Sequence, residues 1–112
     1  MQGKVVVITG GLGVLGRAAG KVVHEAGAMP ILIDYAPAPS AALSEDVVSI
    51  GGVDLTKADA AEAAMRRAHE AHGRIDALLN IAGGFVWSKV ADAAIDQWEK
   101  MFAINIKTAV NA

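Results

Sequence analysis

Four glycines within seven residues separate an apolar, β-branched run from a helical pattern near the start of the chain. Lys4 to Thr9 reads KVVVIT, which is typical of a buried parallel strand. From Val14 to Ala26 apolar and small residues recur at helical spacing, and Gly27 is placed to end that helix. A strand, a glycine-rich turn and a helix in this order indicate a place where the backbone itself must approach a ligand closely.

The rest of the chain continues the alternation of strands and helices. We expect further strands over 29–33, 47–53 and 75–81, a helix over 57–72 that ends at Gly73, and a last helix from about residue 96. The segment 35–46 contains two prolines and is expected to be a loop.

The last helix carries two further expectations. Asp96 and Glu99 have the spacing of a capping box. The large apolar residues of this helix are expected to face inward; they are Trp98, Met101, Phe102 and Ile106. The chain ends in TAVNA, within this helical pattern and without a capping residue, so we expect the domain to continue beyond it.

This order predicts an α/β fold with a doubly wound parallel sheet of the Rossmann type. Right-handed crossovers place about four strands in the order 3-2-1-4, which is the first half of such a sheet. The 112 residues allow one domain, and a chain that is 54% hydrophobic and 20% charged is not disordered.

Composition and charge exclude several other classes. A net charge of −2 gives no sign of a nucleic-acid or anionic membrane partner. The absence of cysteine excludes disulfides and thiolate chemistry, and it fits a reducing compartment. With no long apolar run and no signal peptide, we expect a cytoplasmic protein. His69 and His72 share a helix face but lack a third ligand, so we expect no metal site.

The glycine turn has the context of a dinucleotide-binding fingerprint. Gly10 permits the tight turn, Gly13 lets the backbone approach a pyrophosphate, and Gly16 lets the helix pack close to the strand. The free N–H groups of the first helical turn then favour phosphate. We expect the whole stretch to contact the cofactor; it comprises Thr9, Gly10, Gly11, Leu12, Gly13, Val14, Leu15 and Gly16. The alternative is an ordinary tight turn between strand and helix.

Asp34 follows the second strand, where an acidic residue binds the ribose hydroxyls of a dinucleotide. Its carboxylate would repel a 2′-phosphate, which favours NAD over NADP. The alternative is a simple turn residue at a strand end. Tyr35 either lines the adenine pocket or is exposed.

Four motifs together resemble the short-chain dehydrogenase/reductase family. They are TGGLGVLG at 9–16, VDL at 53–55, NIAGG at 80–84 and INIK at 104–107. The resemblance implies an NAD(P)-dependent oxidoreductase that transfers hydride between nicotinamide and a carbonyl or alcohol substrate, and that forms a homodimer or homotetramer when full length.

The resemblance also assigns roles to individual residues. It implies that Asp54 and Leu55 border the adenine, and that the chain at Asn80, Ala82 and Gly83 passes close to the nicotinamide ribose. It implies that Asn105 takes part in a proton relay. The alternatives are a cap or turn residue for Asp54 and a polar residue on a solvated helix face for Asn105.

The catalytic Ser, Tyr and Lys of the family follow the helix that carries its Asn, and this chain ends seven residues after Asn105. The only tyrosine, Tyr35, has Pro39 four residues later instead of Lys. We therefore expect the N-terminal, cofactor-binding half of such an enzyme, inactive by itself. Two other functions stay open: a non-catalytic dinucleotide-binding module, and an NAD-dependent epimerase or dehydratase of the extended branch, which the TGxxGxxG spacing allows.

Overall fold

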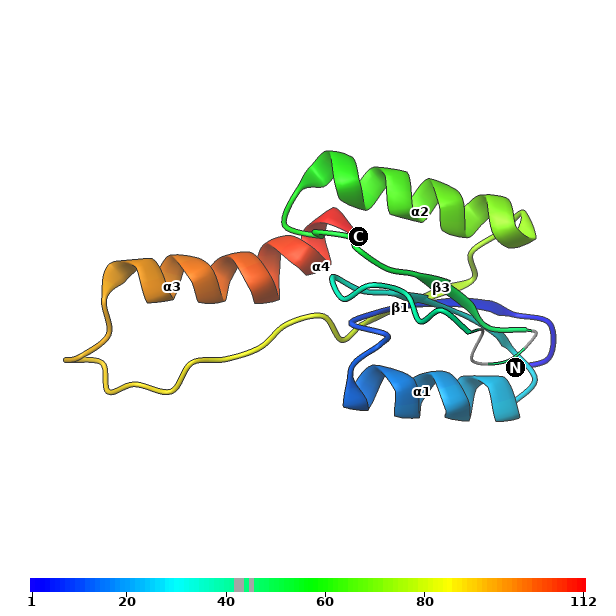
Figure 1. Ribbon diagram of the computed structural model, residues 1–112, viewed down its shortest axis with the longest axis horizontal. Coiled ribbons are helices and arrows are strands. Elements are labelled where there is room, and N and C mark those ends of the chain that lie inside the picture. The colour runs from blue at the N-terminus through cyan, green and yellow to red at the C-terminus, as the bar shows by residue number, and fades with distance from the viewer. Residues whose placement is uncertain (42–43, 45) are drawn as a thin grey trace.

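Four parallel strands form one sheet in the computed structural model, which describes residues 1–41, 44 and 46–112 (Figure 1). The order across the sheet is β3-β2-β1-β4. The strands are β1 (Val5–Thr9), β2 (Met29–Ile33), β3 (Val48–Ile50) and β4 (Ala77–Asn80). The predicted fold class and strand order are thus confirmed. Of the expected loop 35–46, residues 42, 43 and 45 lie outside the described residues.

The two faces of the sheet are covered by different helices, because successive side chains of a strand point to opposite faces. Val6 and Ile8 pack with Val23 of α1 (Val14–Glu25). Val5 and Val7 pack on the other face against α2 (Ala58–His72), which contributes only small buried residues; they are Ala61, Ala64 and Ala68. Figure 1 shows α1 and α2 on opposite sides of the sheet. Double coverage explains the unbroken β-branched run at the start of the chain.

Glycines end both helices as expected. Gly27 and Gly73 have φ of 82° and 71°, values that other residues adopt only at a cost. Two strands are shorter than expected. The strand expected over 47–53 covers only Val48–Ile50, because the chain turns at Gly52 (φ 72°) and the Val53 N–H then donates to the Asp34 carbonyl. The strand expected over 75–81 covers Ala77–Asn80.

The last helix runs as three consecutive segments: α3 (Ile95–Phe102), the π-helical turn η1 (Ala103–Lys107) and α4 (Thr108–Asn111). The expectation that its large apolar residues face inward is wrong. Trp98, Phe102 and Ile106 are about half exposed, and α3 has no buried residue. The reason is the course of the helix: α3 extends past the ends of the strands instead of lying on the sheet, whereas α4 packs against α2 (Figure 1).

The expected capping box is also wrong. The helix begins at Ile95, its N-cap residue is Ala94, and no side chain caps it; Asp96 lies within the first turn instead. The π-helical turn was not predicted from the sequence. Within the described part of the chain, every helix is too short or too polar to cross a membrane.

Candidate functional site

The buried hydroxyl of Thr9 joins the carboxyl ends of β1 and β4. Its oxygen accepts hydrogen bonds from the N–H groups of Ile81 and Ala82, both at 3.2 Å, and the hydroxyl lies 3.3 Å from Oδ1 of Asn80. Thr9 is 1% exposed. Its hydroxyl therefore fixes where the chain leaves β4, although the side chain itself does not line the cleft described below.

The glycine turn is folded too tightly for side chains at three of its positions, Gly10, Gly11 and Gly16. A Cβ on Gly16 would overlap the carbonyl oxygen of Gly10, and a Cβ on Gly11 would overlap Leu32 of β2. Gly10 itself has φ of 65°. A Cβ on Gly13 would meet only the carbonyl oxygen of Gly10, at 3.4 Å, so the absence of a side chain leaves open space above the turn. The turn thus presents bare backbone at the start of α1.

Asp34 is tied to the glycine turn. One carboxylate oxygen accepts a hydrogen bond from the Leu12 N–H at 2.9 Å, and the other accepts one from the Ala36 N–H at 3.0 Å. These two bonds hold the carboxylate at the end of β2, half-buried and facing the turn. Leu12 thus contributes its backbone N–H to orienting the carboxylate.

Asp54 is held by Thr56, two residues further along. Oδ1 of Asp54 accepts hydrogen bonds from the Thr56 hydroxyl at 2.6 Å and from the Thr56 N–H at 3.0 Å. These bonds, the hydroxyl first, lower the pKa of Asp54 below its ordinary value and keep the side chain ionised. Asp54 does not cap α2, whose N-cap residue is Lys57.

Asn105 connects the π-helical turn to the loop after β4. Its Oδ1 accepts from the Gly84 N–H at 3.2 Å, while its Nδ2 donates to the carbonyls of Gly84 and Met101, both at 2.9 Å. The carboxamide is therefore occupied by backbone groups. A Cβ on Gly83 would overlap the Asn105 Oδ1, so the loop passes as close to this side chain as glycine allows.

An open cleft of about 880 Å³ lies along the carboxyl ends of the strands. That volume is in the range of small-molecule and cofactor sites. The cleft brings together most of the predicted cofactor-binding residues; these are Gly10, Gly13, Val14, Leu15, Gly16, Asp34, Tyr35, Asp54, Leu55, Ala82 and Gly83. The other predicted cofactor-binding residues do not line it; they are Thr9, Gly11, Leu12 and Asn80. Two of them are hydrogen-bonded to residues that do: Thr9 to Ala82 and Leu12 to Asp34. Asn105, predicted for a proton relay, does not line the cleft either.

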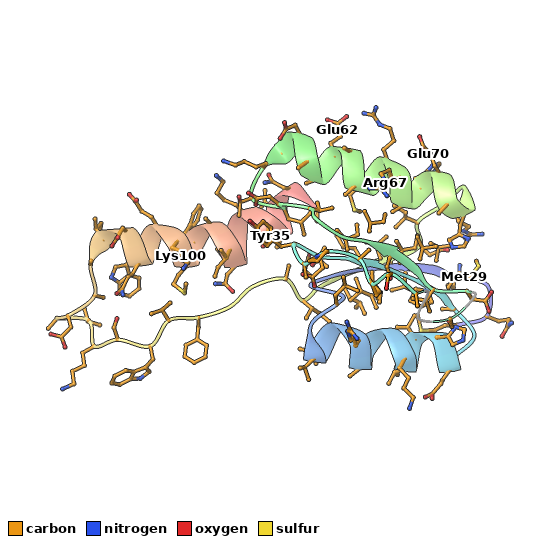
Figure 2. The ribbon with its side chains drawn as sticks, viewed as in Figure 1. Met29, Tyr35, Glu62, Arg67, Glu70 and Lys100 are labelled. Carbon is orange, nitrogen blue, oxygen red and sulfur yellow. The ribbon has the colours of Figure 1, made fainter. Side chains whose placement is uncertain are left out.

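Sequence reasoning missed six residues that line the cleft; they are Val53, Thr56, Ile81, Lys100, Ile104 and Thr108. Three of them are spaced by four along the last helix; they are Lys100, Ile104 and Thr108. Helical periodicity predicts that residues at this spacing share one face, so this signal could have found them. Figure 2 shows Tyr35 beside the sheet and Lys100 on the helix that extends beyond it. Tyr35 is 76% exposed, so it both lines the cleft and remains largely open to solvent.

The cleft fits an elongated, phosphate-containing ligand better than a metal ion. Backbone N–H groups at the start of α1 suit phosphate, and the two carboxylates at the ends of β2 and the VDL segment suit hydroxyl or amine donors. In the described part of the chain, no three His, Asp or Glu residues are grouped so that they could hold a metal. The bare turn above Gly13 and the oriented carboxylate of Asp34 are compatible with a dinucleotide.

Comparison with known proteins points to one family. The family model for short chain dehydrogenase matches residues 4–112. An uncharacterized oxidoreductase of Staphylococcus aureus is 31% identical over 108 residues, which are 93% of this chain and 47% of that protein. An uncharacterized oxidoreductase of Staphylococcus saprophyticus is 34% identical over 111 residues, 96% of this chain and 45% of that protein. The chain spans about half the length of these curated relatives.

Solved structures agree with the fold. A short-chain dehydrogenase/reductase from Serratia marcescens superposes with a TM-score of 0.84 at 32% identity, covering 99% of this chain and 50% of that one. A 3-ketoacyl-(acyl-carrier-protein) reductase from Brucella melitensis, solved in complex with NADH, has a TM-score of 0.87 at 20% identity, covers 98% of this chain and 47% of that one, and shows the fold alone. The family model matches nearly every residue, and the glycine turn, Asp34 and the VDL segment meet at one cleft. This chain therefore belongs to the short-chain dehydrogenase family.

Proposed function

We propose that this chain is the dinucleotide-binding half of an NAD-dependent oxidoreductase. In the whole protein, hydride would pass between the nicotinamide and a carbonyl or alcohol substrate. The membership in an oxidoreductase family supports the reaction class, and the cleft supports the location of the cofactor.

The observation that carries the proposal is the carboxylate of Asp34. It lies at the end of β2, and the N–H of Leu12 in the glycine turn holds it toward the cleft. A carboxylate fixed there can accept hydrogen bonds from both ribose hydroxyls and would repel a 2′-phosphate. NAD is therefore the preferred cofactor in this proposal, and NADP is disfavoured.

The other residues of the cleft would each contact a different part of the dinucleotide. The backbone at Gly13 to Leu15 would bind the pyrophosphate, Asp54 and Leu55 would border the adenine, and Ala82 and Gly83 would pass the nicotinamide ribose. NAD, when bound, supplies the hydride acceptor. The protein itself would bind and orient the dinucleotide. The hydrogen bonds of Thr9 and Asn105 contribute to this because they fix the loop after β4.

A role for Asn105 in a proton relay stays a prediction. Its carboxamide makes three bonds to backbone groups, which favours a part in positioning the loop. The proposal extends to a homodimer or homotetramer in the whole protein, and to a cytoplasmic location, which the cysteine-free sequence suits. A non-catalytic binding module would use the same cleft without a substrate.

The test is a comparison of NAD and NADP binding by isothermal titration calorimetry. We expect the chain to bind NAD more tightly than NADP. The variant Asp34→Ala should lose about 10- to 100-fold in NAD affinity, because it removes charged hydrogen bonds, and should no longer discriminate against the 2′-phosphate. Asp92→Ala removes an exposed carboxylate outside the cleft and should change neither value. Tighter binding of NADP would refute the role of Asp34, and no binding of either would refute the proposal.

A further inference from the structure

The last helix makes a long-range contact with the VDL segment. Nδ2 of Asn111 donates a hydrogen bond to the carbonyl oxygen of Leu55 at 2.9 Å, across 56 positions in the sequence. Asn111 is half-buried and Leu55 is 5% exposed, so the bond is partly shielded from water. None of the four motifs that identify the family contains Asn111.

Leu55 belongs to a segment whose other residues are also held by hydrogen bonds. The Val53 N–H donates to the Asp34 carbonyl at 2.9 Å, and Thr56 holds the carboxylate of Asp54. Asn111 adds the bond at Leu55. We call residues 53–56, all of which line the cleft, the cleft-wall segment.

The helix that carries Asn111 also faces the cleft directly. Thr108, three residues before Asn111, is 6% exposed and lines the cleft. Residues three apart share a helix face. On this face Thr108 lines the cleft, and Asn111 contacts the cleft-wall segment. The hydroxyl of Thr108 donates to the Ile104 carbonyl at 2.8 Å and is therefore already engaged. Asn111 is thus the residue of this face that is hydrogen-bonded to the cleft-wall segment.

We propose that Asn111 is a positioning residue for the adenine end of the cofactor site. It acts through the backbone of Leu55, keeping the cleft-wall segment at the distance from α4 at which adenine fits between them. The inference rests on the proposed function, since it assumes that the cleft-wall segment borders the adenine. It predicts that Asn111 affects ligands that contain adenine and leaves ligands without adenine unchanged.

The experiment compares Asn111→Leu, which has a similar size and no donor, with the wild-type chain. Calorimetric titrations use three probes: NAD, AMP and inorganic pyrophosphate, which carries the phosphates without adenine. We expect the dissociation constants of NAD and AMP to rise about three- to tenfold, the effect of one hydrogen bond, and that of pyrophosphate to stay the same. Val110→Ala alters the adjacent, 78% exposed position and should change none of them.

A second measurement covers the case in which Asn111→Leu does not fold. Asn111→Asp keeps the shape and places an acceptor against the Leu55 carbonyl, so it should weaken AMP binding further and accelerate amide hydrogen exchange over 53–57. Equal loss of AMP and pyrophosphate binding would overturn the inference, because it would indicate general destabilisation, and so would unchanged AMP binding. If the wild-type chain bound neither NAD nor AMP, the proposed function itself would fail instead.

Discussion

Replacing Thr9 by Val tests how the carboxyl ends of β1 and β4 are joined. The two side chains have nearly the same shape, so the substitution creates no cavity and removes only the hydroxyl. The N–H groups of Ile81 and Ala82 then lose their acceptor, and Asn80 loses its partner. A buried donor without a partner costs about 1–3 kcal/mol.

The expected loss of stability lies near the lower end of the range that two unsatisfied donors would give. Ile81 and Ala82 are half-buried, so water can replace part of what the hydroxyl supplied. We therefore expect Thr9→Val to lower the free energy of unfolding by about 2–3 kcal/mol, or roughly 10 °C in melting temperature for a domain of this size. NAD binding should weaken as well, because Ala82 lines the cleft.

Urea denaturation followed by circular dichroism measures the loss directly. Thr9→Ser is the matched control, since it keeps the hydroxyl and removes a methyl group; it should lose less stability than Thr9→Val. The reasoning would be refuted if Thr9→Val unfolded within about 0.5 kcal/mol of the wild type, or if Thr9→Ser were the less stable of the two. Either result would mean that packing of the methyl group, and not the hydroxyl, matters at this position.

Two further predictions concern the glycine turn and the opposite end of the sheet. Gly16→Ala places a Cβ against the Gly10 carbonyl, so we expect it to lower stability by about 1–3 kcal/mol and to abolish measurable NAD binding, both checked by thermal unfolding and titration. Asp76 accepts hydrogen bonds from Arg74 and from the Val5 N–H, which hold the pKa of that carboxyl well below its ordinary value of 3.8. Because the pKa is lowered, the ionised carboxyl stabilises the fold above about pH 4, and this contribution is lost as the pH falls. Asp76→Asn should therefore lower the urea midpoint more at pH 7 than at pH 3. An equal shift at both pH values would contradict this.

Much of the fold could be predicted because its signals are local. The β-branched run of β1, the glycines that end α1 and α2, and the alternation of elements each depend on neighbouring residues. The chirality of crossovers then determines the strand order with little further information. Asp34 could be placed at the cleft for the same reason: it directly follows a strand, and the carboxyl ends of parallel strands meet at one edge.

The last helix shows where local signals stop being sufficient. Periodicity indicates which of its residues share a face, but only the course of the chain decides whether that face meets anything. In this structure α3 extends past the sheet, and Trp98 and Phe102 remain exposed. Likewise, the spacing of Asp96 and Glu99 suggests a cap that the actual start at Ile95 does not use.

The sequence by itself determined which groups meet at the cleft: a turn of bare backbone, a carboxylate after the second strand, and the motifs that identify the family. The tertiary structure decided which groups hold those parts in place. The Thr9 bonds to Ile81 and Ala82 span more than 70 positions, and the Asn111 bond to Leu55 spans 56. Such contacts follow from how the elements pack against one another, which no short stretch of sequence encodes.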